Sequence, residues 1–263
     1  MAPPLRIAVC VKRVAEASEA EFEVDAEGRL RARGLVYDIN EWDDYALEEA
    51  LRMKESLGGE VVVFTVGGPE DEEVLRKCLA KGADEAVRID APGLSDPLLI
   101  AELLSAAISR DRFDLILAGA QASDDGYAAV PSLMASLMAL PFATLVKRVE
   151  IRGSLVVAHR ELEGGVEEVV ELSIPALLSI QSGINEPRYV SIMGLRRASK
   201  KPIKVLSLEE LKKTRPLPAA EERLKVVGYE IPSSERRAQL LEGPADKAAE
   251  AILRILKERG ILA

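Results

Sequence analysis

Apolar runs without polar alternation recur through the first half of the chain, and each is followed by a segment with helical spacing. The strand-like runs are 5–11, 60–66, 86–89 and 115–118, and the helical patterns are 42–57, 72–81 and 97–109. A strand without polar alternation is covered on both faces, and strands that alternate with helices at this spacing form a parallel sheet. Residues 1–140 are therefore predicted to form a doubly wound α/β unit.

Residues 143–181 change to alternating segments that are separated by glycine turns. The candidate strands are 144–151, 154–161 and 166–172, and an apolar run at 175–181 follows them. This pattern predicts an antiparallel extension of the sheet. The uncharged stretch 126–146 contains Pro131 and Pro141, so it is interpreted as a buried helix and a strand, not as a membrane span.

Prolines break the chain into short pieces after about residue 204, and the last piece is an amphipathic helix at 244–259. One stripe of this helix contains Ala248, Ile252, Ile255 and Leu256. We therefore expect an α/β domain over 1–203, with a loop at 182–204, and an extended C-terminal arm over 204–263. The apolar stripe could pack on the chain's own sheet or on a partner subunit, and the pattern favours neither.

Composition narrows the possible functions. The 263 residues carry 35 basic and 44 acidic side chains, a net charge of −9, so the overall charge does not attract nucleic acid or an anionic membrane. Two cysteines and one histidine are too few for a zinc cage, an iron–sulfur cluster or a disulfide framework. His159 has no GxSxG partner and is interpreted as a half-exposed strand residue. Reduced cysteines and an amino terminus without signal features favour the cytoplasm.

Four loops follow or face the predicted parallel strands, at the edge where doubly wound sheets bind ligands. They are 10–13, 40–44, 67–69 and 119–130. Gly67 and Gly68 would let a phosphate approach the backbone, although a Gly-Gly-Pro sequence after a strand is usually only a turn. Asp124 or Asp125 would cap the following helix or bind a ribose hydroxyl, and capping is favoured for at least one of them. The absence of GxGxxG and GxxxxGK[ST] excludes the standard nucleotide fingerprints.

The segment 182–204 combines positive charge with apolar side chains. Six basic residues and no acidic one lie between Arg188 and Lys204. Exposed apolar anchors within such a basic surface suit transient docking on acidic proteins. A solvated basic helix whose Ile192 and Leu195 point inward explains the same pattern equally well.

Several motifs resemble the β subunit of electron-transfer flavoproteins, over nearly the whole chain. The run 10–14 resembles the opening strand and loop of that family, and Asn40 with the helix at 46–51 resembles its second ligand loop. The spacing from Arg160 to Ser179 fits the family signature. The sequence Asn-Glu-Pro-Arg-Tyr at 185–189, with its basic tail, resembles the family's recognition loop, and these last two motifs are the most specific.

The resemblance implies a non-catalytic subunit of a heterodimer with an α subunit, which holds most of an FAD, while the β subunit buries an AMP. It also implies electron transfer from flavin dehydrogenases to a membrane quinone oxidoreductase, without membrane insertion of this chain. Trp42 would approach the flavin, and Ile192 would anchor the docking. The alternatives are an electron-bifurcating β subunit with a second FAD, or a stand-alone nucleotide-binding or adenylating α/β protein.

The resemblance also implies the site residues. The cofactor-binding residues would be Cys10, Asn40, Glu41, Trp42, Asp43, Gly67, Gly119, Ala120, Gln121, Ala122, Ser123, Asp124, Asp125, Gly126, Tyr127, Ala128, Ala129 and Val130. The docking residues would be Arg188, Tyr189, Ile192, Met193, Leu195, Arg196, Arg197, Lys200 and Lys201. No catalytic or metal-binding residue is expected. Glu41 stands where the family usually has proline, and 127–130 lack its Thr and Gln, so backbone N–H groups would have to hold the phosphate.

Overall fold

The structure is a computed structural model that describes residues 4–16, 21–214, 223–231, 240–241 and 243–262. The chain divides into two compact units. The first comprises Met1–Phe22 with Ala32–Val227, and the second comprises Glu23–Arg31 with Gly228–Ala263. The candidate site and the basic segment both belong to the first unit.

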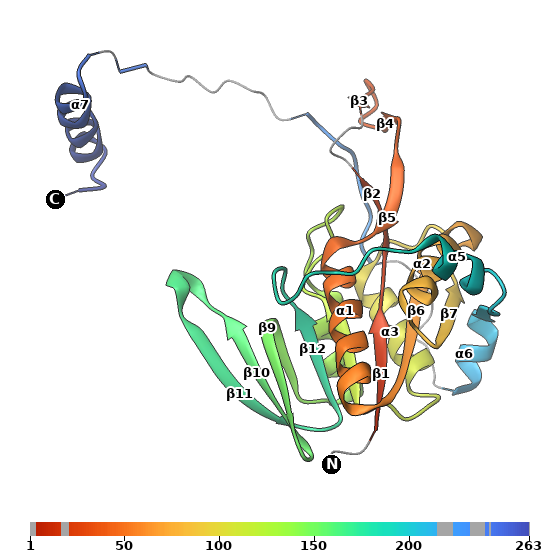
Figure 1. Cartoon of the computed structure of the whole chain (residues 1–263). Coiled ribbons are helices and arrows are strands. Elements are labelled where there is room, and N and C mark those ends of the chain that lie inside the picture. Colours follow the sequence, from red (N-terminus) through yellow and green to blue (C-terminus); the bar gives the residue numbers. More distant parts are fainter. Residues whose placement is uncertain (1–3, 17–20, 215–222, 232–239, 242, 263) are drawn as a thin grey trace. The chain divides into compact units, whose positions relative to one another are not determined.

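The first unit is built around one sheet, which has nine strands when the described residues are counted, in the order β11-β10-β9-β12-β8-β1-β6-β7-β13 (Figure 1). The strands that pair in parallel are β1 (Leu5–Cys10), β6 (Gly59–Gly67), β7 (Glu85–Asp90), β8 (Leu115–Gly119), β12 (Ala176–Ile180) and β13 (Lys204–Leu206). β9 (Phe142–Arg152) is parallel to β12 but antiparallel to β10 (Leu155–Glu161), which pairs with β11 (Glu167–Ser173). The predicted α/β class, with a mostly parallel sheet and an antiparallel extension, is confirmed.

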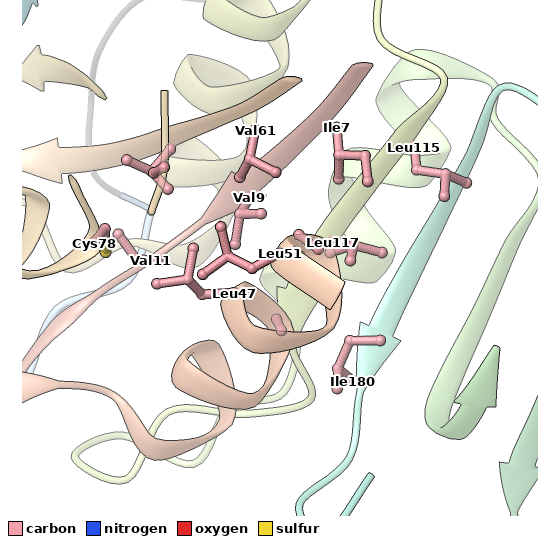
Figure 2. Close-up of a cluster of buried hydrophobic side chains, with 14 of the residues drawn as sticks. Ile7, Val9, Val11, Leu47, Leu51, Val61, Cys78, Leu115, Leu117 and Ile180 are labelled. Carbon is pink, nitrogen blue, oxygen red and sulfur yellow. The ribbon is translucent and has the colours of Figure 1, made fainter. Parts of the chain in front are cut away.

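Helices cover both faces of this sheet. α1 (Glu41–Leu57) and α2 (Glu72–Lys81) pack on one face, while α3 (Pro97–Ile108) and α4 (Val130–Met138) pack on the other. Alternate residues of one strand enter the two cores, so that Val9 faces α1 whereas Ala8 faces α3 and α4. Figure 2 shows Leu47 and Leu51 of α1 pointing toward the strands of the sheet. Burial on both faces explains why these strands read as continuous apolar runs.

Local signals fix the ends of several helices. The side chain of Asp96 accepts hydrogen bonds from the N–H groups of Leu98 and Leu99 and so caps α3, as the sequence predicted. α4 ends at Ala139, which has a left-handed conformation, two residues before Pro141. The sequence interpreted this stretch as a helix buried on most sides, and the structure agrees: Pro131, Met134 and Ala135 are buried, and Ser136 alone is exposed among residues 130–138.

Several short elements carry no clear signal in the sequence. They are the strands β2 (Arg13–Glu16), β3 (Glu21–Val24), β4 (Leu30–Arg33) and β5 (Val36–Ile39), the 3-10 turns η1 (Pro69–Asp71) and η2 (Glu163–Gly165), and the helix α6 (Leu208–Thr214). β2 pairs antiparallel with β5. Residues 204–214, which the sequence assigned to the C-terminal arm, form β13 and α6 within the first unit. The second unit contains α7 (Ala245–Glu258), near the predicted bounds. No described helix combines the length and the apolar content that a bilayer crossing requires.

Candidate functional site

A cavity of about 250 Å³ opens at the carboxyl ends of the parallel strands in the first unit. Its walls come from the loops that follow β1, β6, β7 and β8 and from the first turns of α1, α3 and α4. Backbone N–H groups at helix starts converge in such a place, which is why open α/β sheets bind ligands there. The cavity is therefore the candidate ligand site.

Most of the predicted cofactor-binding residues line this cavity. Those in its wall are Cys10, Asn40, Asp43, Gly67, Gly119, Gln121, Ala122, Asp125, Tyr127, Ala128, Ala129 and Val130. The others, which belong to the same loops but lie outside the wall, are Glu41, Trp42, Ala120, Ser123, Asp124 and Gly126.

The prediction missed one wall of the cavity. This wall is the loop after β7 and the start of α3, with Ala91, Gly93, Leu94, Ser95, Pro97, Ile100 and Leu104. Its signal was present in the sequence, because a strand followed by the Asp96-Pro97 helix start must place one more loop on the same sheet edge. The missed residues are largely apolar and supply a surface on which a flat ring could pack.

Asp43 joins two of the loops that form the cavity. Its carboxylate accepts hydrogen bonds from the backbone N–H groups of Lys12 (2.8 Å) and Gly119 (2.9 Å). The side chain is buried, and this burial raises the pKa of Asp43 to about 7, although the backbone hydrogen bonds and Asn40 favour the charged form. Asp43 thus ties the ends of β1 and β8 to the first turn of α1.

Replacing Asp43 by asparagine should flatten the pH dependence of stability. Because the pKa is near 3.8 in the unfolded chain and about 7 in the fold, the folded state holds an extra proton between these values. The contribution of Asp43 to the free energy of unfolding is therefore largest below about pH 4 and falls as the pH rises to about 7. Asp43→Asn removes this slope, and it also costs ~1–3 kcal/mol because one amide group cannot accept both N–H bonds.

Chemical denaturation at several pH values between 4 and 8 measures this effect. Glu41→Gln is the matched control, since Glu41 lies on the same turn of α1 and is exposed. Parallel pH profiles for the Asp43 variant and the unmodified chain would contradict the assignment.

Asn40 fixes the loop after β8 to the start of α1. Its side-chain amide donates to the carbonyl of Gln121 (2.8 Å) and accepts from the N–H of Ser123 (3.1 Å). Asn40 stands at the N-cap of α1 but makes no capping bond with its side chain. An amide, which both donates and accepts, is the side chain that this arrangement needs.

Lys12 binds the same loop from the other side. Its ammonium group donates to Asp124 (2.6 Å) and Asp125 (2.7 Å). Burial alone would lower the pKa of Lys12, but the two carboxylates outweigh it and hold the pKa above the usual value. The expectation that Asp124 or Asp125 caps the following helix was wrong, because α4 begins after Ala129 without a side-chain cap.

Arg13 is the cationic residue of the cavity wall that forms no ion pair with a described residue. Its guanidinium lies 3.7 Å from the centre of the Tyr37 ring, and its Nε is buried without a hydrogen-bond partner. At the opposite wall, Pro131 in the first turn of α4 has no N–H to offer. A phosphate in this cavity would therefore find Arg13 and backbone N–H groups as its donors.

Trp42 lies at the edge of the site. Its indole N–H donates to the side-chain oxygen of Gln181 (3.0 Å), and the amide of Gln181 donates to Glu161 (3.2 Å). The ring is half-buried at the start of α1. This hydrogen bond links the start of α1 to the residue that follows β12.

Groups suited to nucleophilic or metal chemistry are remote or buried. Burial raises the pKa of both thiols, Cys10 and Cys78, far above the usual value, so they stay protonated. His159 lies on β10, with Glu167 3.6 Å away, and does not line the cavity. Within the described ranges, no three His, Cys, Asp or Glu residues cluster as metal ligands would.

The basic segment contains the short helix α5 (Ile192–Ala198), which Ser191 caps by accepting a hydrogen bond from the N–H of Gly194. The predicted docking residues Tyr189, Ile192 and Met193 are 97%, 86% and 70% exposed. Leu195 is also exposed, as are Arg196, Arg197 and Lys200. The interpretation that Ile192 and Leu195 point inward is therefore wrong. Two further residues of the set, Arg188 and Lys201, bind within the chain instead.

Comparisons with known proteins agree with this arrangement. The model of the electron transfer flavoprotein domain family matches residues 30–211. The electron transfer flavoprotein subunit beta of Methylophilus methylotrophus is 40% identical over 262 residues, which cover 97% of this chain and 98% of that protein. The subunit of the same name from Bacillus subtilis is 36% identical over 239 residues, which cover 89% and 92%.

A third relative belongs to a differently named complex. It is subunit CarD of the caffeyl-CoA reductase-Etf complex of Acetobacterium woodii, 37% identical over 211 residues, which cover 79% of this chain and 80% of that protein. The first two relatives thus match most of the length of this chain, and this chain covers most of theirs. The chain therefore belongs to the electron-transfer flavoprotein family, as one of its β subunits.

Proposed function

We propose that this chain pairs with an α subunit, that the pair holds an FAD mainly in the α subunit, and that the cavity of this chain holds an AMP. In this proposal the heterodimer accepts electrons from flavin dehydrogenases and passes them to a membrane quinone oxidoreductase. The observation that carries it is the cavity at the carboxyl ends of the strands, in a chain of the β-subunit family. The buried thiols and the remote histidine also favour a carrier without its own bond-making chemistry.

The size of the cavity favours a mononucleotide. Its volume of about 250 Å³ lies below the ~300–1,000 Å³ of ordinary ligand pockets. A second FAD, as in an electron-bifurcating subunit, would need room for a dinucleotide. The similarity to CarD of the caffeyl-CoA reductase-Etf complex nevertheless keeps this second candidate open.

Released nucleotides distinguish the two candidates. The chain is co-expressed with an electron-transfer flavoprotein α subunit, the yellow heterodimer is denatured, and the nucleotides are separated and quantified. One FAD and one AMP per heterodimer support the proposal, whereas two FAD support the bifurcating subunit. A colourless preparation in every combination, with a monomeric chain, would reject both.

The docking part of the proposal rests on exposed apolar side chains within a basic surface. Ile192 is the expected anchor, because it is 86% exposed and the exposed Arg196 and Arg197 follow it one turn later. Truncating such an anchor typically costs ~2 kcal/mol or more, which corresponds to about a thirtyfold weaker complex. Ile192→Ala should therefore slow dehydrogenase-driven flavin reduction while the flavin content stays normal.

Stopped-flow flavin reduction at low salt measures this loss. The control is Val166→Ala, which truncates another exposed aliphatic side chain, located between η2 and the edge strand β11. Equal rates of flavin reduction for Ile192→Ala and the unmodified heterodimer would contradict the proposal that this segment docks on the dehydrogenase.

We also propose that the C-terminal arm packs on the α subunit. The apolar stripe of α7 supports this, because none of its residues is buried. In this proposal the α/β domain extends beyond residue 203 and includes β13 and α6. The arm that packs on the α subunit then belongs to the second unit.

A further inference from the structure

We propose that Arg188 is a positioning residue, which holds the docking segment against α1, and that it does not itself bind the dehydrogenase. This inference rests on the proposed docking function of residues 182–204. It changes the role that the sequence suggested for Arg188, from a surface cation to an internal clamp.

The side chain of Arg188 is occupied by two carboxylates of α1. Its Nε donates to Glu48 (2.7 Å) and its Nη2 also donates to Glu48 (3.1 Å), which makes a bidentate pair. Nη1 and Nη2 donate to Glu55 at 2.6 Å and 3.2 Å. Since a guanidinium has five N–H donors and these bonds use four, little is left for a partner protein.

Glu48, the main partner of Arg188, is a buried carboxylate. The side chain of Glu48 is only 5% exposed, and Arg52 also donates to it (2.9 Å). Burial raises the pKa of Glu48, but the hydrogen bonds from Arg188 and Arg52 outweigh burial and hold the pKa below its usual value. The backbone N–H of Arg188 donates to the same carboxylate (3.2 Å), so one buried acid fixes both the side chain and the main chain of residue 188.

Neighbouring residues attach the same segment to other turns of α1. The amide of Asn185 donates to the carbonyl of Tyr45 (3.1 Å) and to Glu49 (3.0 Å). Arg52 donates to the carbonyl of Glu186 (3.2 Å). The segment is thus bound along α1, the helix whose first turn forms part of the cavity wall.

The other end of the segment is fixed on α2. A Cβ at Gly194 would lie 2.6 Å from the carbonyl oxygen of Ala80, so only glycine allows this close approach of α5 to α2. Arg76 donates to the carbonyls of Ala198 (2.8 Å) and Lys201, and Lys201 donates to the carbonyl of Ala83 (2.8 Å). Lys201 is therefore a second member of the predicted docking set that acts inside the chain.

The exposed residues Tyr189, Ile192 and Met193 lie between these two attachments. A segment that is ordered before it meets its partner loses less conformational entropy on binding, and so binds more tightly with the same contacts. Releasing one end should weaken docking although every contact residue is still present. The clamp therefore predicts an effect on KM for the dehydrogenase, with little change in kcat.

Two measurements on the αβ heterodimer test this. The first is amide hydrogen exchange of the peptide 185–195, without any dehydrogenase. The second is KM and kcat with a flavin dehydrogenase that reduces the unmodified heterodimer. Arg188→Gln should accelerate exchange and raise KM about tenfold, the cost expected for reordering a few residues on binding. Arg188→Lys, which keeps the charge but not the bidentate geometry, should fall in between.

Two further variants keep the test decisive. Glu55→Gln removes the more exposed half of the clamp without leaving a buried charge unpaired, and it should raise both exchange and KM. Arg196→Gln removes an exposed charge that makes no ion pair within the described residues, and it should raise KM without changing exchange.

Unchanged exchange in Arg188→Gln and Glu55→Gln would overturn the clamp, whatever the rates show. Faster exchange with an unchanged KM would also overturn it, because the ordered segment would then not matter for docking. If Ile192→Ala leaves the reduction rate unchanged, the docking function itself fails, and this result is distinct from a failure of the clamp.

Discussion

Gly119→Ala is expected to empty the cavity and to destabilise the first unit. A Cβ at position 119 would lie 2.5 Å from Oδ1 of Asp43, 2.6 Å from Cβ of Trp42 and 2.8 Å from the backbone nitrogen of Asp43. All three atoms belong to the start of α1, and two of them, Cβ of Trp42 and the nitrogen of Asp43, cannot rotate away, so α1 or the end of β8 must move. Overpacking costs ~1–3 kcal/mol, and loss of the buried Gly119 N–H bond to Asp43 adds ~1.5–3 kcal/mol.

The displaced loop carries much of the proposed nucleotide site, because Gln121 to Val130 follow directly after β8. If AMP binds only when this loop has its normal position, a distortion that costs ~3 kcal/mol to reverse weakens binding more than a hundredfold. We therefore expect an αβ heterodimer with less than a tenth of the normal AMP content. Nucleotide quantification after denaturation and thermal unfolding measure the two effects.

Gly68→Ala is the matched control for this substitution. A Cβ at position 68 would meet only the end of the Glu70 side chain, which can rotate away, and the φ of −83° suits alanine. We expect nearly normal AMP content and stability for this control. Normal AMP content in Gly119→Ala would show that the bound nucleotide does not depend on the junction between β8 and α1.

The fold could be predicted from the sequence wherever a single physical signal determines the secondary structure of a segment. Strands buried on both faces are continuous apolar runs, so β1, β6 and β8 were found nearly to the residue. The short strands β2 and β5 were missed, because they pair only with each other and have few buried residues to produce a pattern. β13 was missed for a similar reason, since it adds only three residues to the edge of the sheet, at the point where prolines begin to break the chain.

The candidate site was predictable as a place but not as a set of contacts. Chain topology alone brings the loops after parallel strands to one edge, which is why most of the expected residues line a single cavity. Whether a charged side chain faces a ligand or a neighbour depends on packing that no local pattern encodes. Arg188 and Lys12 illustrate this, because each is satisfied by two carboxylates far away in sequence.

Asp43 lies where the proposed nucleotide site and the helix that holds the proposed docking segment meet. It lies in the first turn of α1, the helix to which the proposed docking segment is bound, and it also holds the loops of the cavity. Since α1 contacts the cavity through its first turn and the segment 185–188 through its later turns, a rigid α1 would keep both in register. We therefore expect the two substitutions to have separate effects. Gly119→Ala, beside the first turn of α1, alters the nucleotide content, and Arg188→Gln, beside its later turns, alters the KM for the dehydrogenase.

Loss of the apolar stripe of α7 is expected to prevent assembly with the α subunit. The stripe comprises Ala248, Ile252, Ile255 and Leu256, and the second unit leaves all of them unburied. Burying an isoleucine or leucine contributes ~1.5–3 kcal/mol, so three such side chains contribute about 5 kcal/mol or more. A loss of this size corresponds to more than a thousandfold weaker association.

Ile252→Ala, Ile255→Ala and Leu256→Ala, combined in one variant, remove the stripe and keep the helix, because alanine has the highest helix propensity. The control combines Glu250→Ala and Arg254→Ala, which lie on the opposite side of α7. Co-purification with a tagged α subunit should fail for the stripe variant and for a chain that ends at Pro244, and it should succeed for the control. Full recovery of the heterodimer with the stripe variant would mean that α7 packs elsewhere, and the arm would then have no part in holding the subunits together.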